Sequence, residues 1–145
     1  MKFPKTAEDV VSEIYISSDK YKQYGDLRSR QLIRMLGGVA DDILVEAVIQ
    51  VFEGTNRVES HFLDQEIVGR ILEERKPFTT ISPEKLLERC LTGWNKSVEQ
   101  FPFWLVEVYG IEKTQAALAI IENKELLKIE REKLATIRWW IHKIK

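Results

Sequence analysis

Residues 37–54, which read GGVADDILVEAVIQVFEG, decide the fold. Apolar side chains recur in this stretch at the spacing of one helix face, at Ile43, Leu44, Ala47, Val48 and Val51. The pattern predicts a helix from about Val39 to Phe52, because residues three and four positions apart share one side of a helix. Glycines bound the run on both sides, and glycine commonly closes a helix because it adopts left-handed conformations without steric cost.

The rest of the chain repeats this pattern of apolar runs that end at glycine or proline. Helical spacing predicts a helix capped by Thr6, a helix capped by Asp26, and helices over residues 57–75, 83–91, 97–109, 111–121 and 126–144. Ser82 with Pro83 predicts one helix start, and Ser97 with Gln100 another. Pro102 either kinks that helix or begins a new one.

The predicted fold class is all-α, in one domain over residues 1–145. The one segment with β character, residues 78–81, is too short to build a sheet. We expect seven to eight helices in antiparallel pairs, either as a short array or as an irregular helical bundle. Gly69 lies inside an apolar run, which predicts a close contact between helices at that position.

Composition excludes several classes of protein. The hydrophobic share of 44% and charged share of 31% argue against disorder in a chain of 145 residues. A single cysteine excludes an internal disulfide, and with two histidines it leaves little for a zinc site. No apolar run approaches the roughly 20 residues that span a membrane. The first five residues lead into acidic residues and not into the apolar core of a signal peptide, so we expect a cytoplasmic protein.

Two stretches of the chain align at an offset of 72 residues. Gly38 then matches Gly110, and Val39 matches Ile111. Residues 47–49, which read AVI, match residues 119–121, which read AII. A shift of half that length gives no clear match. In each copy an apolar helix ends at glycine and a second helix begins at once, which resembles the helix–turn–helix units of HEAT-like α-solenoids. This resemblance implies helix pairs stacked into an extended surface for a partner protein.

The sequence offers few candidates for chemistry. It has no phosphate-binding glycine loop and no serine nucleophile elbow. Cys90 shares an apolar stripe with Leu86 and Leu87, which predicts a buried and inert thiol. His61 and Asp64 are three positions apart and could share a helix face, with Glu66 close by. One imidazole and one carboxylate make an incomplete metal site. We therefore predict no catalytic residue, no metal and no cofactor.

Aromatic and charged residues are unevenly distributed. All four tryptophans lie at or after residue 94, and the densest aromatic patch, residues 101–104, includes Trp104. Trp139 and Trp140 point about 100° apart on a helix, so one can fill the core while the other faces a partner. The last 22 residues carry a net charge of +4 and the preceding 123 residues −5. Basic and acidic residues intermix in that last helix, so we expect a protein partner and not a nucleic acid.

Elimination thus points to a non-enzymatic cytosolic protein-binding module of HEAT-like helical type. Small helical proteins of this kind include immunity- and antitoxin-like partner proteins, a comparison that rests on size and class. Arg30 and Arg34 lie one helical turn apart and together could bind a carboxylate or phosphate. The alternative is a small helical enzyme or metal binder centred on His61 and its neighbouring carboxylates. The candidate partner-binding residues are Arg30, Arg34, His61, Asp64, Glu66, Trp104, Trp139 and Trp140.

Overall fold

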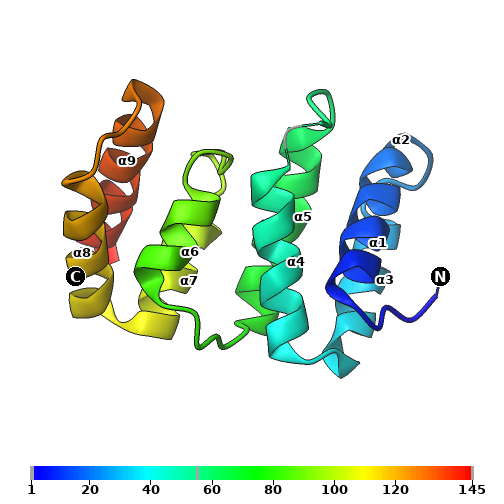
Figure 1. The fold of residues 1–145 in the computed structure, drawn as a ribbon. Coiled ribbons are helices and arrows are strands. Elements are labelled where there is room, and N and C mark those ends of the chain that lie inside the picture. The colour runs from blue at the N-terminus through cyan, green and yellow to red at the C-terminus, as the bar shows by residue number, and fades with distance from the viewer. Residues whose placement is uncertain (1, 55, 145) are drawn as a thin grey trace.

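The computed structural model describes residues 2–54 and 56–144 and shows a row of helix pairs (Figure 1). All regular structure in these two ranges is helical, which confirms the all-α fold class. A four-residue helix, α2 (Tyr21–Tyr24), and a 3₁₀ turn at Leu36–Gly38 lie in the bends. The longer helices are α1 (Ala7–Asp19), α3 (Leu27–Met35), α4 (Asp41–Glu53), α5 (His61–Arg75), α6 (Pro83–Cys90), α7 (Gln100–Tyr109), α8 (Ile111–Glu122) and α9 (Lys128–Ile144).

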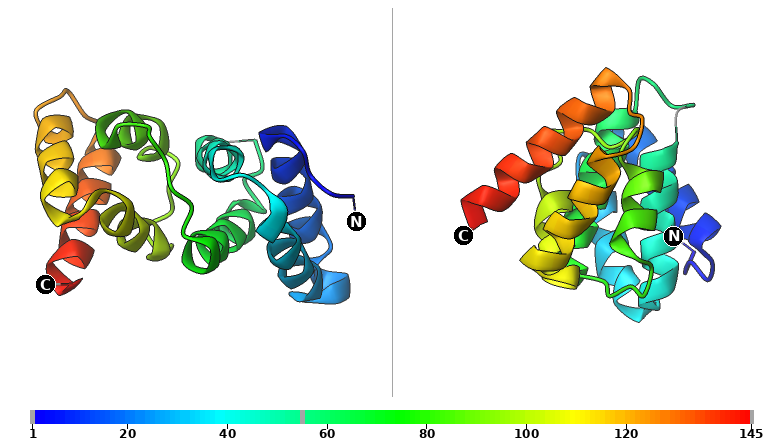
Figure 2. Two further views of the ribbon diagram at one scale, coloured as in Figure 1. Left: turned by 90° about the horizontal axis from the view of Figure 1, so that it is seen from below. Right: turned by 60° about the vertical axis from the view of Figure 1, so that its left-hand side comes forward.

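The helices form two rows of opposite direction. In Figure 1, α1, α4, α6 and α8 run upward, and α3, α5, α7 and α9 run downward. Each helix packs against its neighbours in its own row, and the view from below shows the two rows side by side (Figure 2). The two ends of the chain lie at opposite ends of the array. None of the described helices is both long enough and apolar enough to cross a membrane.

The core lies between the two rows and is centred on α4. Of the five apolar positions predicted to face inward on this helix, four are buried and Ile43 is half-buried. Phe52 contacts Phe101 edge to face at 5.1 Å between ring centroids, which joins α4 to α7. Trp94 is fully buried beside Phe101, and its indole N–H donates to the Val98 carbonyl oxygen at 3.0 Å. Burying each large apolar side chain contributes roughly 1.5–3 kcal/mol.

Two predicted helix starts are confirmed by hydrogen bonds. The hydroxyl oxygen of Thr6 accepts from the Asp9 N–H at 3.1 Å, and that of Ser82 accepts from the Lys85 N–H at 3.3 Å. Asp26 precedes α3 but makes no capping hydrogen bond with its side chain. The predicted close contact at Gly69 is also confirmed, because a Cβ there would lie 2.7 Å from an amide oxygen of Gln100.

Two predicted boundaries are wrong. The predicted helix at 97–109 begins at Gln100, because Ser97 bonds to Asn95 in a tight turn and does not cap α7. Pro102 lies in the first turn of α7, where its missing N–H costs nothing. The helix predicted from Arg57 begins at His61, and residues 57–60 form a turn that the Ser60 N–H closes onto the Arg57 carbonyl.

The unequal spacing of the helix pairs explains the internal similarity at 72 residues. The upward helices α4, α6 and α8 begin 42 and 28 residues apart. An offset of 72 therefore relates α4 to α8 in the same row, whereas a shift of half that length aligns no pair with its neighbour. The HEAT-like character of the array stays a prediction.

Candidate functional site

The largest apolar depression among the surfaces described lies between α5, α7 and α9. It has a volume of about 360 Å³ and opens to solvent. Apolar side chains form its floor and walls, and polar side chains stand at its rim. We call it the α7 groove. The apolar lining comprises Leu72, Phe103, Trp104, Val106 and Ile144, and the polar lining comprises Glu73, Lys76, Gln100 and Glu107.

Trp104 forms the floor of the α7 groove and is 3% exposed. Its indole N–H donates to the Pro77 carbonyl oxygen at 2.8 Å, which satisfies the one polar atom of the side chain. Tyr109, one helical turn and one residue further on, donates its hydroxyl to the Ile81 carbonyl at 2.6 Å. The extended segment between α5 and α6 is therefore held by hydrogen bonds from α7, which makes the floor of the groove rigid.

Next to the α7 groove, three aromatic rings form a chain that runs outward to solvent. Phe103 meets Trp140 edge to face at 5.4 Å, and Trp140 meets Trp139 at 4.7 Å. Trp140 is half-buried and Trp139 is 53% exposed, as expected for adjacent residues on a helix. The ammonium group of Lys143 lies 4.8 Å from the centre of the Trp139 ring. Trp104, Trp139 and Trp140 thus belong to one region of α7 and α9.

The predicted arginine pair lies elsewhere. Arg30 and Arg34 are both exposed on α3, at the N-terminal end of the array (Figure 1). Arg30 forms an exposed ion pair with Asp26 at 3.3 Å. Because α3 and α9 belong to the first and last helix pairs, the arginines and the tryptophans do not form one compact site.

The structure gives His61, Asp64 and Glu66 different neighbours. His61 Nε2 lies 3.1 Å from the Gly93 carbonyl oxygen and also contacts the side-chain amide of Gln65. Asp64 is 3% exposed and pairs with Arg57, while Glu66 is exposed. Residues 2–54 and 56–144 contain no group of three or more His, Cys, Asp or Glu side chains that could hold a metal ion. The metal-binding alternative therefore lacks a ligand set in these ranges.

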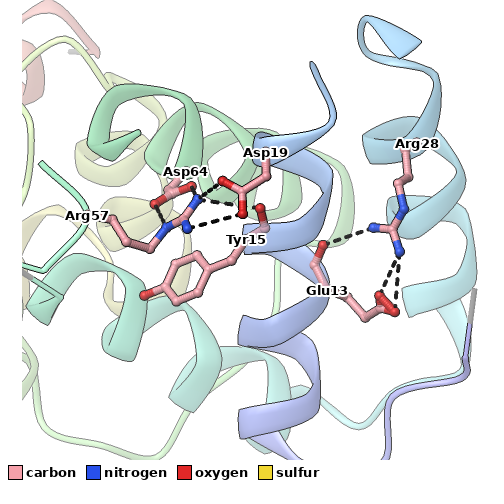
Figure 3. A network of polar contacts seen from close by, with 6 residues as sticks. All are labelled: Glu13, Tyr15, Asp19, Arg28, Arg57 and Asp64. Atoms are coloured by element: carbon pink, nitrogen blue, oxygen red, sulfur yellow. Dashed lines mark hydrogen bonds and ion pairs between the residues drawn. The ribbon is translucent and has the colours of Figure 1, made fainter. Parts of the chain in front are cut away.

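Arg57 is an organising residue that sequence reasoning missed. Its Nε donates to Asp64 Oδ2 at 2.9 Å, and its Nη2 donates to Asp19 Oδ1 at 2.7 Å (Figure 3). Its guanidinium also lies 4.3 Å from the centre of the Tyr15 ring. The hydrogen bonds to Asp64 and Asp19 raise the pKa of Arg57, so the charge is permanent. The one local signal is an arginine seven positions before an aspartate at a predicted helix start.

A second arginine holds α1 from its other side. Arg28, which stands near Arg30 in the sequence, turns inward from α3 and donates to Glu13 Oε2 at 3.0 Å (Figure 3). It also donates to the Ser17 hydroxyl at 2.8 Å. Arg28 therefore stabilises the packing of α1 on α3 and does not join Arg30 and Arg34 at the surface.

Cys90 is buried and carries a free thiol. Burial raises the pKa of this thiol, so the reactive thiolate is suppressed. The side chain lies on the apolar face of α6, as the sequence pattern predicts.

Comparisons with known proteins give no family at this point. No protein-family model, no curated protein and no solved structure matches the chain. The functional argument therefore depends on the geometry of the molecule itself.

Proposed function

We propose that the protein is a non-enzymatic, cytosolic protein-binding module. The α7 groove receives an apolar side chain of a partner protein, and the exposed Trp139 ring extends the contact surface. The observation that carries the proposal is the open apolar depression of about 360 Å³, with an aromatic chain beside it. Aromatic residues in such pockets supply much of the binding free energy at protein interfaces.

Charge at the rim defines the chemistry of the partner segment. Lys76 lies 3.6 Å from Glu107, so these two charges offset each other. Glu73 is exposed at the same rim and forms no ion pair with the residues that the structure describes. A lysine or arginine next to the apolar anchor of the partner would pair with Glu73. The groove thus suits a segment that combines a bulky apolar side chain with an adjacent basic one.

The arrangement of helices supports a narrower proposal. Successive antiparallel pairs in two rows are what a HEAT-like array requires, and such arrays present extended surfaces to partner proteins. Size and helical class are the support for placing the protein among immunity- or antitoxin-like partners. Both proposals concern the kind of partner and leave the role of the α7 groove unchanged.

A selection of displayed peptides against the folded protein tests the groove. We expect enrichment of peptides with a bulky apolar residue beside lysine or arginine. Ile144 is 40% exposed at the groove, so Ile144→Glu should weaken these peptides at least about tenfold without unfolding the protein. Ile120, 48% exposed on α8, provides the matched control, and Ile120→Glu should leave binding unchanged.

A charge reversal and a capture experiment complete the test. Glu73→Lys should weaken the peptides with basic residues more than those without them. A partner captured from the source cells should be retained by the wild type and by Ile120→Glu, but lost with Ile144→Glu. Equal capture or equal peptide affinity for the two isoleucine variants would contradict the proposal.

A further inference from the structure

A second depression, on a different part of the molecule, is lined by positive charge alone. It lies where the turn before α5, the segment between α6 and α7, and the N-terminal part of α9 meet, and its volume is about 440 Å³. The charged residues that line it are Lys96 and Lys133, and no carboxylate belongs to its lining among the residues that the structure describes. This is unusual in a chain with 23 acidic and 22 basic residues. The full lining comprises Val58, His61, Thr92, Gly93, Trp94, Asn95, Lys96 and Lys133.

Lys133 is held in this depression with little compensation for its charge. The residue is 8% exposed, and its ammonium group donates to the Thr92 carbonyl oxygen. A carbonyl dipole offsets only part of the cost of burying an ammonium ion, which has three N–H donors. Burial lowers the pKa of Lys133, and the charge of Lys96 lowers it further.

The nearest carboxylate is engaged elsewhere. Glu130 accepts from the Thr92 hydroxyl at 2.9 Å with one oxygen and from the Leu127 N–H at 2.9 Å with the other. It favours the charged form of Lys133 through space, but it forms no ion pair with that lysine. Lys96 is exposed and forms no ion pair within the described ranges. Two ammonium groups therefore face one depression without a bound counter-charge from the protein.

His61 supplies a third donor at the edge of this depression. Gln65 is fully buried, and its amide oxygen accepts from the Asn95 N–H at 2.7 Å. Its amide nitrogen therefore donates to the Gly93 carbonyl at 2.7 Å and faces His61 Nε2. We assign to His61 the tautomer with the proton on Nδ1, because Nε2 then accepts from Gln65. The Nδ1–H group is left as a donor.

We propose that this depression binds an oxyanion, a phosphate or a carboxylate group, through Lys96 and Lys133. Lysine ammonium groups bind such anions as point charges, and the partial burial of Lys133 strengthens the interaction because water screens it less. This site is separate from the α7 groove and does not depend on the function proposed for that groove.

Backbone NMR titration with inorganic phosphate and with acetate tests the proposal, with chloride at matched ionic strength as the reference. We expect saturable shifts of the amides of residues 58–61 and 92–97, with a dissociation constant below about 10 mM. Saturation with phosphate alone assigns a phosphate ligand, and saturation with acetate alone assigns a carboxylate. Absence of saturation with either anion would overturn the proposal.

Two lysine variants locate the binding. Lys133→Met keeps the apolar stem and should weaken the anion at least about tenfold, the effect of losing roughly 1.4 kcal/mol. Lys96→Met changes an exposed side chain, cannot disturb the core, and should weaken the anion severalfold. Lys113, exposed on α8, provides the control, and Lys113→Met should leave the shifts unchanged. Equal affinities for Lys96→Met and Lys113→Met would contradict the site.

Discussion

The side-chain amide of Gln65 donates to the carbonyl oxygen of Gly93 at 2.7 Å and ties the start of α5 to the segment between α6 and α7. Gln65 is fully buried, so its hydrogen bonds to Gly93 and Asn95 are needed to satisfy the amide. Gly93 can approach this closely because it lacks a side chain. A Cβ at Gly93 would lie 1.7 Å from the carbonyl oxygen of Phe52, closer than any atoms can pack.

Gly93→Ala should therefore destabilise the protein by about 3 kcal/mol, because a backbone atom and not a flexible side chain blocks the new methyl group. Urea denaturation followed by circular dichroism measures the change. Gly37→Ala is the matched control, since a Cβ at that position meets nothing within 4 Å. Similar midpoints for the two variants would show that the close approach at Gly93 is not required.

Arg57→Met should destabilise the protein by about 3 kcal/mol, because Asp64, 3% exposed, is then left as an unpaired buried charge. Arg57→Met combined with Asp64→Asn should regain part of that loss, because both charges are removed together. Thermal and urea denaturation measure both variants.

Arg34 provides the comparison for Arg57. It is exposed on α3, and Arg34→Met should change the free energy of unfolding by less than about 0.5 kcal/mol. If Arg57→Met were as mild as Arg34→Met, the contacts of Arg57 with Asp64 and Asp19 would not stabilise the fold.

Arg89 predicts a specific dependence of stability on pH. It donates to both carboxylate oxygens of Glu46 at 2.9 Å and so joins α6 to α4. These hydrogen bonds lower the pKa of Glu46 from its ordinary value of 4.5. A carboxyl group with a lowered pKa stabilises the fold above its ordinary pKa, and this stabilisation is lost as the pH falls through the pKa of the folded state.

Melting temperatures between about pH 7 and pH 3 should therefore fall more steeply in the wild type than in Arg89→Met. Arg138→Met, which removes the ion pair of Arg138 with Glu122, both of them exposed, should follow the wild-type curve. Parallel curves for the wild type and Arg89→Met would rule out this coupling.

The Cys90 thiol should resist labelling in the native protein, because it is buried and its pKa is raised. Ellman's reagent at about pH 8 should react slowly without denaturant, and the rate should rise with the unfolded fraction as urea is added. Rapid native-state labelling, at the rate seen in full denaturant, would show that α6 opens independently of global unfolding.

Local rules made much of the fold predictable from the sequence. The apolar face of α4 and the caps at Thr6 and Ser82 depend on residues within one or two helical turns. Trp139 and Trp140 could be separated into an exposed and a half-buried ring from their 100° offset alone.

Long-range pairings could not be predicted in this way. Arg57 finds Asp19 across 38 positions, and Lys133 finds Thr92 across 41. Nothing in local spacing marks such partners, and a homologue alignment would be needed to detect them from sequence. The helix start at Arg57 was misplaced for a related reason, since its tertiary contacts with α1 hold residues 57–60 in a turn.

The two-row arrangement has a consequence for how the molecule comes apart. Because each helix pair packs mainly on the pairs next to it, cooperativity passes from one neighbour to the next and not through a shared centre. Loss of packing in the pair α8 and α9 should fray that end first, while amide hydrogens of α4, with neighbours on both sides, exchange last. Any partner that spans several pairs would act as a splint along the array.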